Sequence, residues 1–246
     1  MIFRILLCAL IILSLGCGGR ADKIPLTWSA QNIPKEDVTR VELRNGSIGY
    51  LRMMPGNKDV VVYLNPSSES LESVSTYMNV FNMVGFDALV FDYAPKDSTR
   101  YTEAEVMQKI SSGLQYLHDR GYAYDKIVVY GKGNTCLLTI RTSRVRPIRG
   151  IVLENISDIV VGSILKEAFP ERLPVLILQS VKSKGGAWQN GVSVFSRIVH
   201  NTEAKLTISQ RGSDTDLFFD SDCVNDLNSF FPTAMGMRKD FIGNIW

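Results

Sequence analysis

A short segment near the middle of the chain carries the residues with the clearest chemical meaning. Residues 126–131 form an apolar, β-branched run, which leads into a Gly-Lys-Gly-Asn-Thr turn at 131–135 and then into helix-forming residues. In the pattern Gly-x-Ser-x-Gly, such a strand–turn–helix presents a serine nucleophile. Here the central position holds Gly133 and the last position holds Thr135. The sequence therefore predicts a turn of this shape without the serine.

Serine chemistry also needs a general base, and the chain has two histidines. His118 lies near the end of a predicted helix that precedes the strand 126–131, and His200 ends the helix before a predicted strand at 204–210. Both would lie at the edge where the strands begin, whereas ligands of open α/β sheets bind beyond the carboxyl ends of the strands. A strand of six residues separates these edges by about 20 Å, and a general base acts at roughly 3 Å. We interpret both histidines as helix-terminal residues favoured by the helix dipole.

Strand and helix patterns alternate along most of the chain. Asn45-Gly46 between the first two strands is typical of a hairpin, and the repeated strand–helix units that follow favour a parallel sheet covered on both faces. We therefore expect an α/β fold with a mostly parallel central sheet, helices on both faces and an N-terminal antiparallel hairpin. The predicted strands are 38–43, 47–53, 59–65, 87–93, 126–131, 149–155, 174–180 and 204–210. The predicted helices are 70–84, 102–120, 134–143, 157–168, 187–200 and 215–231.

The start of the chain resembles an export signal. Arg4 precedes an apolar run of eleven residues, Ile5 to Leu15, which as a helix would span about 16 Å and is too short for a bilayer core of about 30 Å. A cleaved signal is therefore favoured over a spanning helix. The run ends in Leu-Ser-Leu-Gly-Cys at 13–17, which resembles the lipobox of bacterial lipoproteins. That resemblance implies that Cys17 is acylated, for example with palmitate; the alternatives are ordinary cleavage near Ala21 or a retained N-terminal anchor.

These features predict a signal peptide at 1–16, a tether or N-terminal arm at 17–37 and one domain at 38–246. The lipobox resemblance implies a protein that is bound to the membrane of the bacterial cell envelope through its lipid. Gly18 rather than Asp follows the cysteine, which favours the outer membrane if the cell is Gram-negative. Without lipidation, the chain is expected to be secreted or periplasmic.

Composition excludes several classes of function. A formal net charge of +2 gives no argument for nucleic-acid binding. Cys136 and Cys223 fall on predicted helices on opposite faces of the sheet and are expected to be buried thiols rather than a disulfide. The turn at 131–135 lacks the spacing of a phosphate-binding P-loop. The two separated histidines and the two separated cysteines cannot form a local metal site, so no metal and no cofactor is expected.

Five segments in order resemble the α/β-hydrolase superfamily, in particular its compact, lidless serine hydrolases. The resemblance covers residues 38–231. The segments are 61–65 (Val-Val-Tyr-Leu-Asn), 85–93 (Gly-Phe-Asp-Ala-Leu-Val-Phe-Asp-Tyr), 121–131, 150–155 and 174–178. In that family the first of these segments is a strand that ends in His-Gly, the third approaches the nucleophile, and the last precedes the catalytic acid. A different α/β fold is the alternative.

The resemblance also implies positions for a catalytic triad, and each of them holds an unsuitable residue. The nucleophile position is Gly133, the acid position is near Ser183, and the histidine position is Ser213. No Asp or Glu occurs from 172 to 202. In the oxyanion loop His-Gly is replaced by Asn65-Pro66, and proline has no N–H to donate. The resemblance therefore implies a hydrolase scaffold with a degenerate triad.

Lysines and a tryptophan are expected to gather at the carboxyl edge of the sheet. They could form a cleft for an anionic or sugar-like ligand, with lysine charge and an aromatic platform; the alternative is solvated lysines and a core-facing tryptophan. The candidate cleft residues are Asn65, Ser67, Lys132, Lys182, Lys184 and Trp188. A second basic group lies at the opposite edge and is explained by the helix dipole or, alternatively, by an anionic surface partner; it comprises Arg141, Arg144, Arg146 and Arg149.

Two functions remain open from the sequence. The first is a non-catalytic envelope lipoprotein that binds an unidentified protein or a small anionic ligand. The alternative is an esterase, peptidase or acyltransferase of the serine-hydrolase type that uses non-standard residues. Its candidate nucleophiles are Ser67, Ser68, Thr135 and Ser213.

Overall fold

The computed structural model describes residues 23–24, 38–66, 69, 71–92, 101–200, 203–210, 212, 217 and 220–235. The predicted signal peptide, Cys17 and most of the tether lie outside the described residues, as do Ser67, Ser68 and Ser213. None of the helices in the described ranges is long and apolar enough to cross a bilayer.

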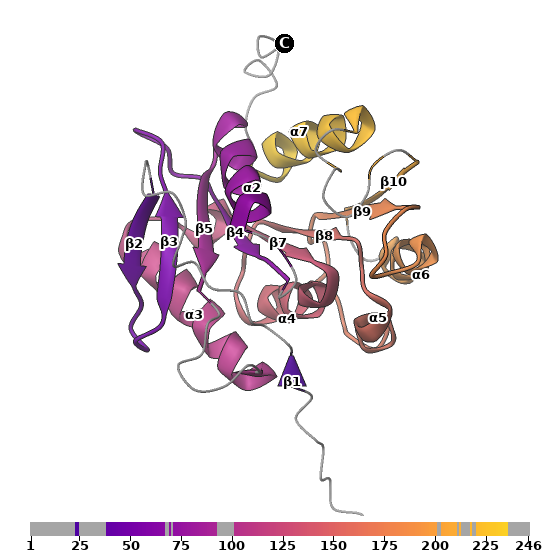
Figure 1. The fold of residues 1–246 in the computed structure, drawn as a ribbon, viewed down its shortest axis with the longest axis horizontal. Coiled ribbons are helices and arrows are strands. Elements are labelled where there is room, and N and C mark those ends of the chain that lie inside the picture. Colours follow the sequence, from indigo (N-terminus) through magenta and orange to yellow (C-terminus); the bar gives the residue numbers. More distant parts are fainter. Residues whose placement is uncertain are drawn as a thin grey trace, which may run out of the picture.

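One eight-stranded sheet forms the centre of the molecule, in the order β10-β9-β8-β7-β4-β5-β3-β2 (Figure 1). β2 and β3 form the predicted hairpin, and β3 also pairs antiparallel with β5. All other neighbouring strands are parallel. The strands are β2 (Val38–Glu42), β3 (Ile48–Arg52), β4 (Val60–Leu64), β5 (Asp87–Phe91), β7 (Ile127–Lys132), β8 (Gly150–Glu154), β9 (Val175–Ser180) and β10 (Ala204–Ser209).

Helices cover both faces of this sheet (Figure 1). α2 (Leu71–Met83) and α7 (Ser221–Met235) lie on one face, where the rings of Phe81 and Phe231 meet edge to face. The other face carries α3 (Glu103–Asp119), α4 (Cys136–Val145), α5 (Asp158–Ile164) and α6 (Trp188–Ile198). Every residue of β4, β5, β7, β8 and β9 is buried. Burial on both faces explains why these strands appear in the sequence as continuous apolar runs rather than alternating ones.

A second, two-stranded sheet was not predicted. β1 (Lys23–Ile24) pairs antiparallel with β6 (Tyr101–Thr102). β6 leads directly into α3, where Thr102 and Glu105 form a reciprocal capping box. β1 therefore lies beside the start of α3.

Two of the predicted helices have wrong boundaries. α5 ends at Ile164 rather than at residue 168, because the backbone tightens into i→i−3 hydrogen bonds from Lys166 to Ser163 and from Glu167 to Ile164. α7 begins at Ser221 rather than at residue 215 and runs on to Met235. The carboxylate of Asp220 accepts a hydrogen bond from the N–H of Asp222, which caps the start of this helix.

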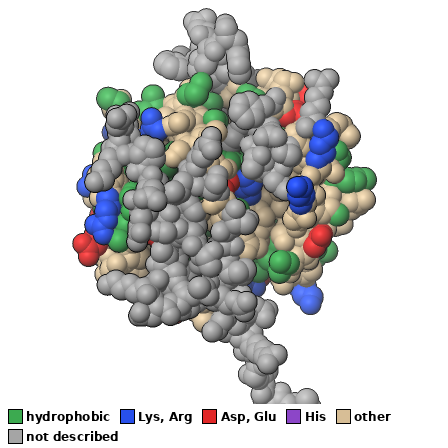
Figure 2. Space-filling model, in the orientation of Figure 1, with side chains coloured by type: hydrophobic (Ala, Val, Ile, Leu, Met, Phe, Trp, Pro, Cys, Tyr) green, Lys and Arg blue, Asp and Glu red, His purple; other side chains and the backbone are tan. Residues whose placement is uncertain are grey.

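The expectation of two buried thiols is confirmed, since Cys136 on α4 and Cys223 on α7 are both free and buried. Burial raises the pKa of the Cys223 thiol to about 12 and that of Cys136 further still, so neither forms a thiolate at neutral pH. Figure 2 shows Lys, Arg, Asp and Glu side chains dispersed over the described part of one face. This dispersal agrees with the near-neutral net charge.

Candidate functional site

The turn at 131–135 has the predicted shape. β7 ends at Lys132, one helical turn follows at Gly133–Thr135, and α4 begins at Cys136. Gly133 has a φ of +62°, a conformation that few residues other than glycine adopt. The nearest atom to a Cβ built at this position would be Cβ of Pro66, at 3.8 Å. The turn lies at the carboxyl edge of the sheet and leaves room for a side chain that the sequence does not supply.

The first glycine of the turn is required by packing. A Cβ at Gly131 would lie 2.0 Å from Oγ1 of Thr139, so no larger residue fits while α4 lies this close to β7. Thr135, one of the alternative nucleophiles, is fully buried. Its hydroxyl donates to the main-chain oxygen of Leu64, lies 2.9 Å from that of Lys132 and accepts from the N–H of Lys132. Thr135 therefore joins β4 to the turn, and its hydroxyl is engaged in main-chain hydrogen bonds rather than available to attack a substrate.

Lys132 does not line an open cleft, which corrects the sequence-based prediction. Its side chain is buried, and its Nζ lies 2.8 Å from Oε1 of Glu69 and 3.5 Å from Oε1 of Glu154. Nζ also donates to the hydroxyl of Tyr77 at 2.9 Å. Lys132 points into the interior because two carboxylates there compensate its charge.

Three tyrosines complete this buried group. The hydroxyls of Tyr77 and Tyr130 donate to the carboxylate of Glu154 at 2.6 Å, and the hydroxyl of Tyr63 donates to Glu69. The rings of Tyr63 and Tyr77 stack with centroids 4.5 Å apart. We call this group the Lys132 cluster; its members are Tyr63, Glu69, Tyr77, Tyr130, Lys132 and Glu154.

The cluster fixes the protonation of its lysine. Burial by itself would lower the pKa of Lys132, but the carboxylates of Glu154 and Glu69 outweigh burial and raise the pKa. Burial raises the pKa of Glu154. Lys132 therefore remains an ammonium ion at neutral pH and cannot act as a general base. The signal for the cluster was in the sequence: Glu154 ends a buried apolar strand, and a glutamate there needs a partner.

Unsatisfied polar groups follow three of the central strands. Asn65, after β4, is fully buried, and neither atom of its amide has a hydrogen-bond partner among the residues that the structure describes. Asn155, after β8, has a φ of +46° and accepts a hydrogen bond from the N–H of Ser180 at 2.8 Å, while its Nδ2 has no partner. The hydroxyl of Ser183, after β9, is also unsatisfied. Most buried polar groups in proteins are paired. The amides and hydroxyl after these three strands that are unpaired among the described residues therefore indicate groups that are available to hydrogen-bond a ligand.

Trp188 and the two loop lysines lie further along the same edge. Trp188 begins α6 and is 39% exposed, so it does not face the core. Lys182 and Lys184, in the loop before it, are exposed. This loop is joined to α5, because the N–H of Asp158 donates to the carbonyl of Gly185 at 3.3 Å. The structure thus brings Lys184 and Trp188 near the start of α5 and separates them from the buried Lys132.

Both histidines lie at the amino edge of the sheet, as expected. His118, in the last turn of α3, stacks on Tyr124 just before β7, with ring centroids 4.8 Å apart. His200 follows α6 and precedes β10. The six-residue length of β7 separates this edge from Gly133 by about 20 Å.

The second basic group is partly neutralised by acids. Arg141 forms ion pairs with Glu103 and Glu167, and Arg144 also pairs with Glu167, at 2.5 Å. These pairs join α3 and α4 to the turn after α5. The side chains of Arg141 and Arg144 therefore serve contacts within the chain.

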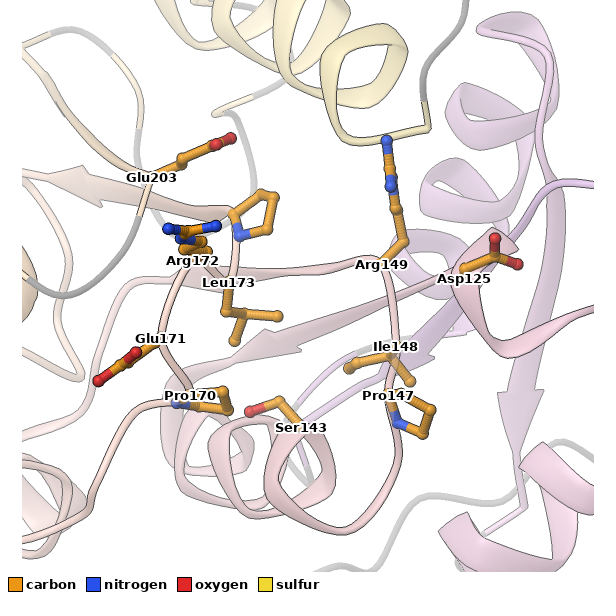
Figure 3. A pocket seen from close by; sticks show the side chains of 11 residues that line it. Asp125, Ser143, Pro147, Ile148, Arg149, Pro170, Glu171, Arg172, Leu173 and Glu203 are labelled. Atoms are coloured by element: carbon orange, nitrogen blue, oxygen red, sulfur yellow. The ribbon is translucent and has the colours of Figure 1, made fainter.

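A separate cleft of about 400 Å³ lies at the amino edge. Figure 3 shows Arg172 and Glu203 on one side of it and Arg149 and Asp125 on the other, above the apolar side chains of Ile148 and Leu173. This cleft lies at the amino edge of the sheet, whereas Gly133 lies at the carboxyl edge, so the cleft is not part of the candidate site. Within the described ranges, no group of three or more His, Cys, Asp or Glu side chains could hold a metal ion.

No protein-family model matches the chain, and no curated protein matches it in sequence. Solved structures do match. The esterase Pf2001 of Pyrococcus furiosus superposes with a TM-score of 0.66 at 17% identity, over 86% of this chain and 100% of that one. This chain has the α/β-hydrolase fold. An esterase/lipase from an uncultured bacterium matches with a TM-score of 0.57 at 12% identity, over 86% of this chain and 87% of that one.

A third α/β-hydrolase-fold neighbour is a predicted CIB-like hydrolase from Thermoplasma acidophilum. Its TM-score is 0.58 at 14% identity, over 80% of this chain and 98% of that one. At such identities the likeness establishes the fold. Gly133 lies at the strand-to-helix turn between β7 and α4.

Proposed function

We propose that this chain is a non-catalytic α/β-hydrolase-fold protein that binds a ligand at the carboxyl edge of its sheet. One observation carries the proposal: the residue at the nucleophile position, Gly133, has the positive φ of the turn and no side chain. Ser183 stands at the acid position and offers a hydroxyl in place of a carboxylate.

The positions of the histidines and the charge of Lys132 support this proposal, because none of these residues can act as a general base beside Gly133. Its two histidines lie at the amino edge, and Lys132, next to Gly133, is held as an ammonium ion between two carboxylates. In a serine protease, loss of the nucleophile–base unit lowers turnover by on the order of 10⁶. An intact oxyanion hole accounts for much of the residual rate, and Pro66 has no N–H to contribute to one.

The unsatisfied amides favour binding as the remaining role. The side chains of Asn65 and Asn155 offer donors, and Asn65 also offers an acceptor, with no partner in the described part of the chain. These groups suit a ligand that carries hydroxyl, ester or amide oxygens. The proposed lipid anchor at Cys17 would hold the protein at the cell envelope.

Thermal unfolding in the presence of a ligand panel tests this role. The panel contains short-chain fatty acids, their glycerol esters and simple sugars. We expect at least one of these to raise the Tm of the wild-type protein and not that of Asn65→Leu. Asn225→Leu, on the exposed side of α7, is the control and should respond like the wild type. A ligand that shifts Asn65→Leu as much as the wild type would contradict the proposed site.

The second candidate is a serine-type esterase, peptidase or acyltransferase with non-standard residues. The structural neighbours favour it, because they are esterases and a hydrolase, and the turn that presents a nucleophile is kept. Its remaining candidate nucleophiles are Ser67, Ser68 and Ser213.

A fluorophosphonate probe distinguishes the two candidates. A chain that the probe labels above a heat-treated control, with the label lost in Ser67→Ala, Ser68→Ala or Ser213→Ala, would establish the second. The first predicts no labelling above that control.

A further inference from the structure

We infer that the domain rests with the carboxyl edge of its central sheet against an anionic membrane surface. This inference rests on the lipid anchor at Cys17 that forms part of the proposed function. It adds which side of the molecule faces the lipid and which residues touch it.

The position of β1 provides the first observation. β1 pairs with β6, which is continuous with the start of α3 (Figure 1). α3 follows β5 and precedes β7, and these two strands lie parallel in the sheet, on either side of β4. Since a crossover helix runs from the carboxyl end of one strand to the amino end of the next, the start of α3 lies at the carboxyl edge. The chain therefore comes from Cys17 to this edge.

The length of chain before β1 is short. Five residues separate Cys17 from Lys23, so their Cα atoms, six positions apart, are at most about 22 Å from each other when the segment is fully extended. The seventeen residues of α3 span about 26 Å between the two edges of the sheet. An acylated Cys17 thus holds the carboxyl edge close to the lipid headgroups, while the amino edge lies beyond this reach.

The second observation is an exposed surface at the same edge. Ile159, in the first turn of α5, is 80% exposed, and Trp188, at the start of α6, is 39% exposed. The two helix starts are joined, because the carboxylate of Asp158 accepts from the N–H of Ala187 at 3.2 Å. We call this surface the α5–α6 patch; it comprises Ile159, Lys182, Lys184 and Trp188.

The chemistry of the patch suits a lipid surface. Tryptophan is enriched where a protein meets the headgroup region, and an aliphatic side chain beside it can enter the acyl boundary. Lys182 and Lys184 are exposed in the adjoining loop, and lysines near a bilayer are attracted by anionic headgroups. The short tether and the patch lie on the same edge of the sheet, so one orientation satisfies both.

Fluorescence quenching in vesicles tests this orientation. The lipidated chain is reconstituted in phosphatidylcholine–phosphatidylglycerol vesicles with brominated acyl chains. The chain has three tryptophans, and Trp28→Phe with Trp246→Phe leaves Trp188 as the reporter. The matched control adds Trp188→Phe and Val199→Trp. Val199 caps the other end of α6 and is 41% exposed, so the two reporters differ in edge and not in helix or exposure.

We expect bromine to quench the reporter at position 188 and to leave the reporter at position 199 at its fluorescence in unbrominated vesicles. Ile159→Asp should reduce the quenching at position 188, and an acidic residue in the first turn of α5 is compatible with the helix dipole; circular dichroism checks the fold. Equal quenching at both positions, or quenching at position 199 alone, would overturn the inference. An intact mass without acyl chains on Cys17 would also overturn it. The ligand-induced shift that Asn65→Leu abolishes does not depend on orientation, so the two proposals fail separately.

Discussion

Gly133 is the residue on which the functional interpretation depends. Its φ of +62° costs a glycine nothing, while a residue with a Cβ pays about 1 kcal/mol or more for the left-handed region. A catalytic serine at this place would have to tolerate that strain. The turn has the strand–turn–helix shape that presents a nucleophile in the pattern Gly-x-Ser-x-Gly, and its central residue has no side chain.

Gly133→Ser should therefore fold and lose about 1 kcal/mol of unfolding free energy. The nearest contact of the new Cβ, 3.8 Å to Pro66, adds no clash. Urea denaturation measures the change. Gly162→Ala, in the middle of α5 with open space around its Cβ position, is the control and should gain about 0.5–1 kcal/mol. A Gly133→Ser variant as stable as the wild type would show that the turn relaxes away from this φ.

Asn65 allows a second test at the level of one residue. Its fully buried amide has no partner among the described residues, and an unsatisfied buried polar group costs about 1–3 kcal/mol. Asn65→Leu should therefore raise the free energy of unfolding of the ligand-free protein by about 1 kcal/mol.

Asn190→Leu is the matched control for this substitution. The amide of Asn190 donates to the carbonyl of Ile156 at 2.9 Å and to the carboxylate of Asp158 at 2.7 Å. Its loss should destabilise the protein, because two acceptors lose their donor. Destabilisation by Asn65→Leu would mean that its amide is satisfied in the folded protein.

The Lys132 cluster acts at the level of elements. Glu69 lies between β4 and α2, Tyr77 on α2, Lys132 at the end of β7 and Glu154 at the end of β8. Their hydrogen bonds therefore join the ends of neighbouring strands to α2, and Lys132 among them immediately precedes Gly133. The cluster therefore supports the shape of the turn. It also keeps Lys132, the amine next to Gly133, protonated, so that this amine cannot act as a base.

Lys132→Met should cost about 3–5 kcal/mol, because it leaves two buried carboxylates without their cation. Lys132→Met combined with Glu154→Gln should recover part of this loss. Lys205→Met is the control, since Lys205 pairs with Asp226 while 52% exposed, and such pairs contribute about 1 kcal/mol or less. Similar losses from both single lysine variants, measured by urea denaturation, would contradict the account of the cluster.

The pH dependence of stability follows from Glu154. Burial raises its pKa above the ordinary 4.5, so the folded protein binds this proton more tightly than the unfolded chain does. The stabilisation from that proton is complete below pH 4.5 and is lost as the pH rises through the folded pKa. The raised pKa of Lys132 keeps the lysine charged throughout this window.

The unfolding free energy of the wild type minus that of Glu154→Gln should therefore fall between pH 4.5 and neutral pH. Urea denaturation at both pH values measures the difference. A difference that is constant, or that rises with pH, would mean that Glu154 is ionised without a penalty.

At the scale of the whole molecule, the sequence predicted the architecture because burial on both faces leaves a plain signal. The apolar runs of β4, β5, β7, β8 and β9, the Asn-Gly hairpin and the repeated strand–helix order identify the sheet. The start of α7 was missed because Asp220 caps the helix through a contact that periodicity does not contain.

Contacts between distant residues account for what the sequence did not predict at the site. Lys132 was placed at the correct edge, but its partners Glu69 and Glu154 lie 63 positions before it and in the next strand. The β1–β6 pair joins two-residue strands, too short for an alternating pattern. The unsatisfied amide of Asn65 depends on what surrounds it in the folded chain.

Ester hydrolysis by the purified protein tests most directly whether the carboxyl edge is without a nucleophile and a base. Turnover of p-nitrophenyl acetate and butyrate is measured for the wild type and for Gly133→Ser, each beside a heat-treated sample. We predict that neither protein exceeds its heat-treated control, because a serine at position 133 would still have no histidine on its edge of the sheet. Turnover by the wild type that a fluorophosphonate abolishes would contradict the account and identify the protein as a hydrolase.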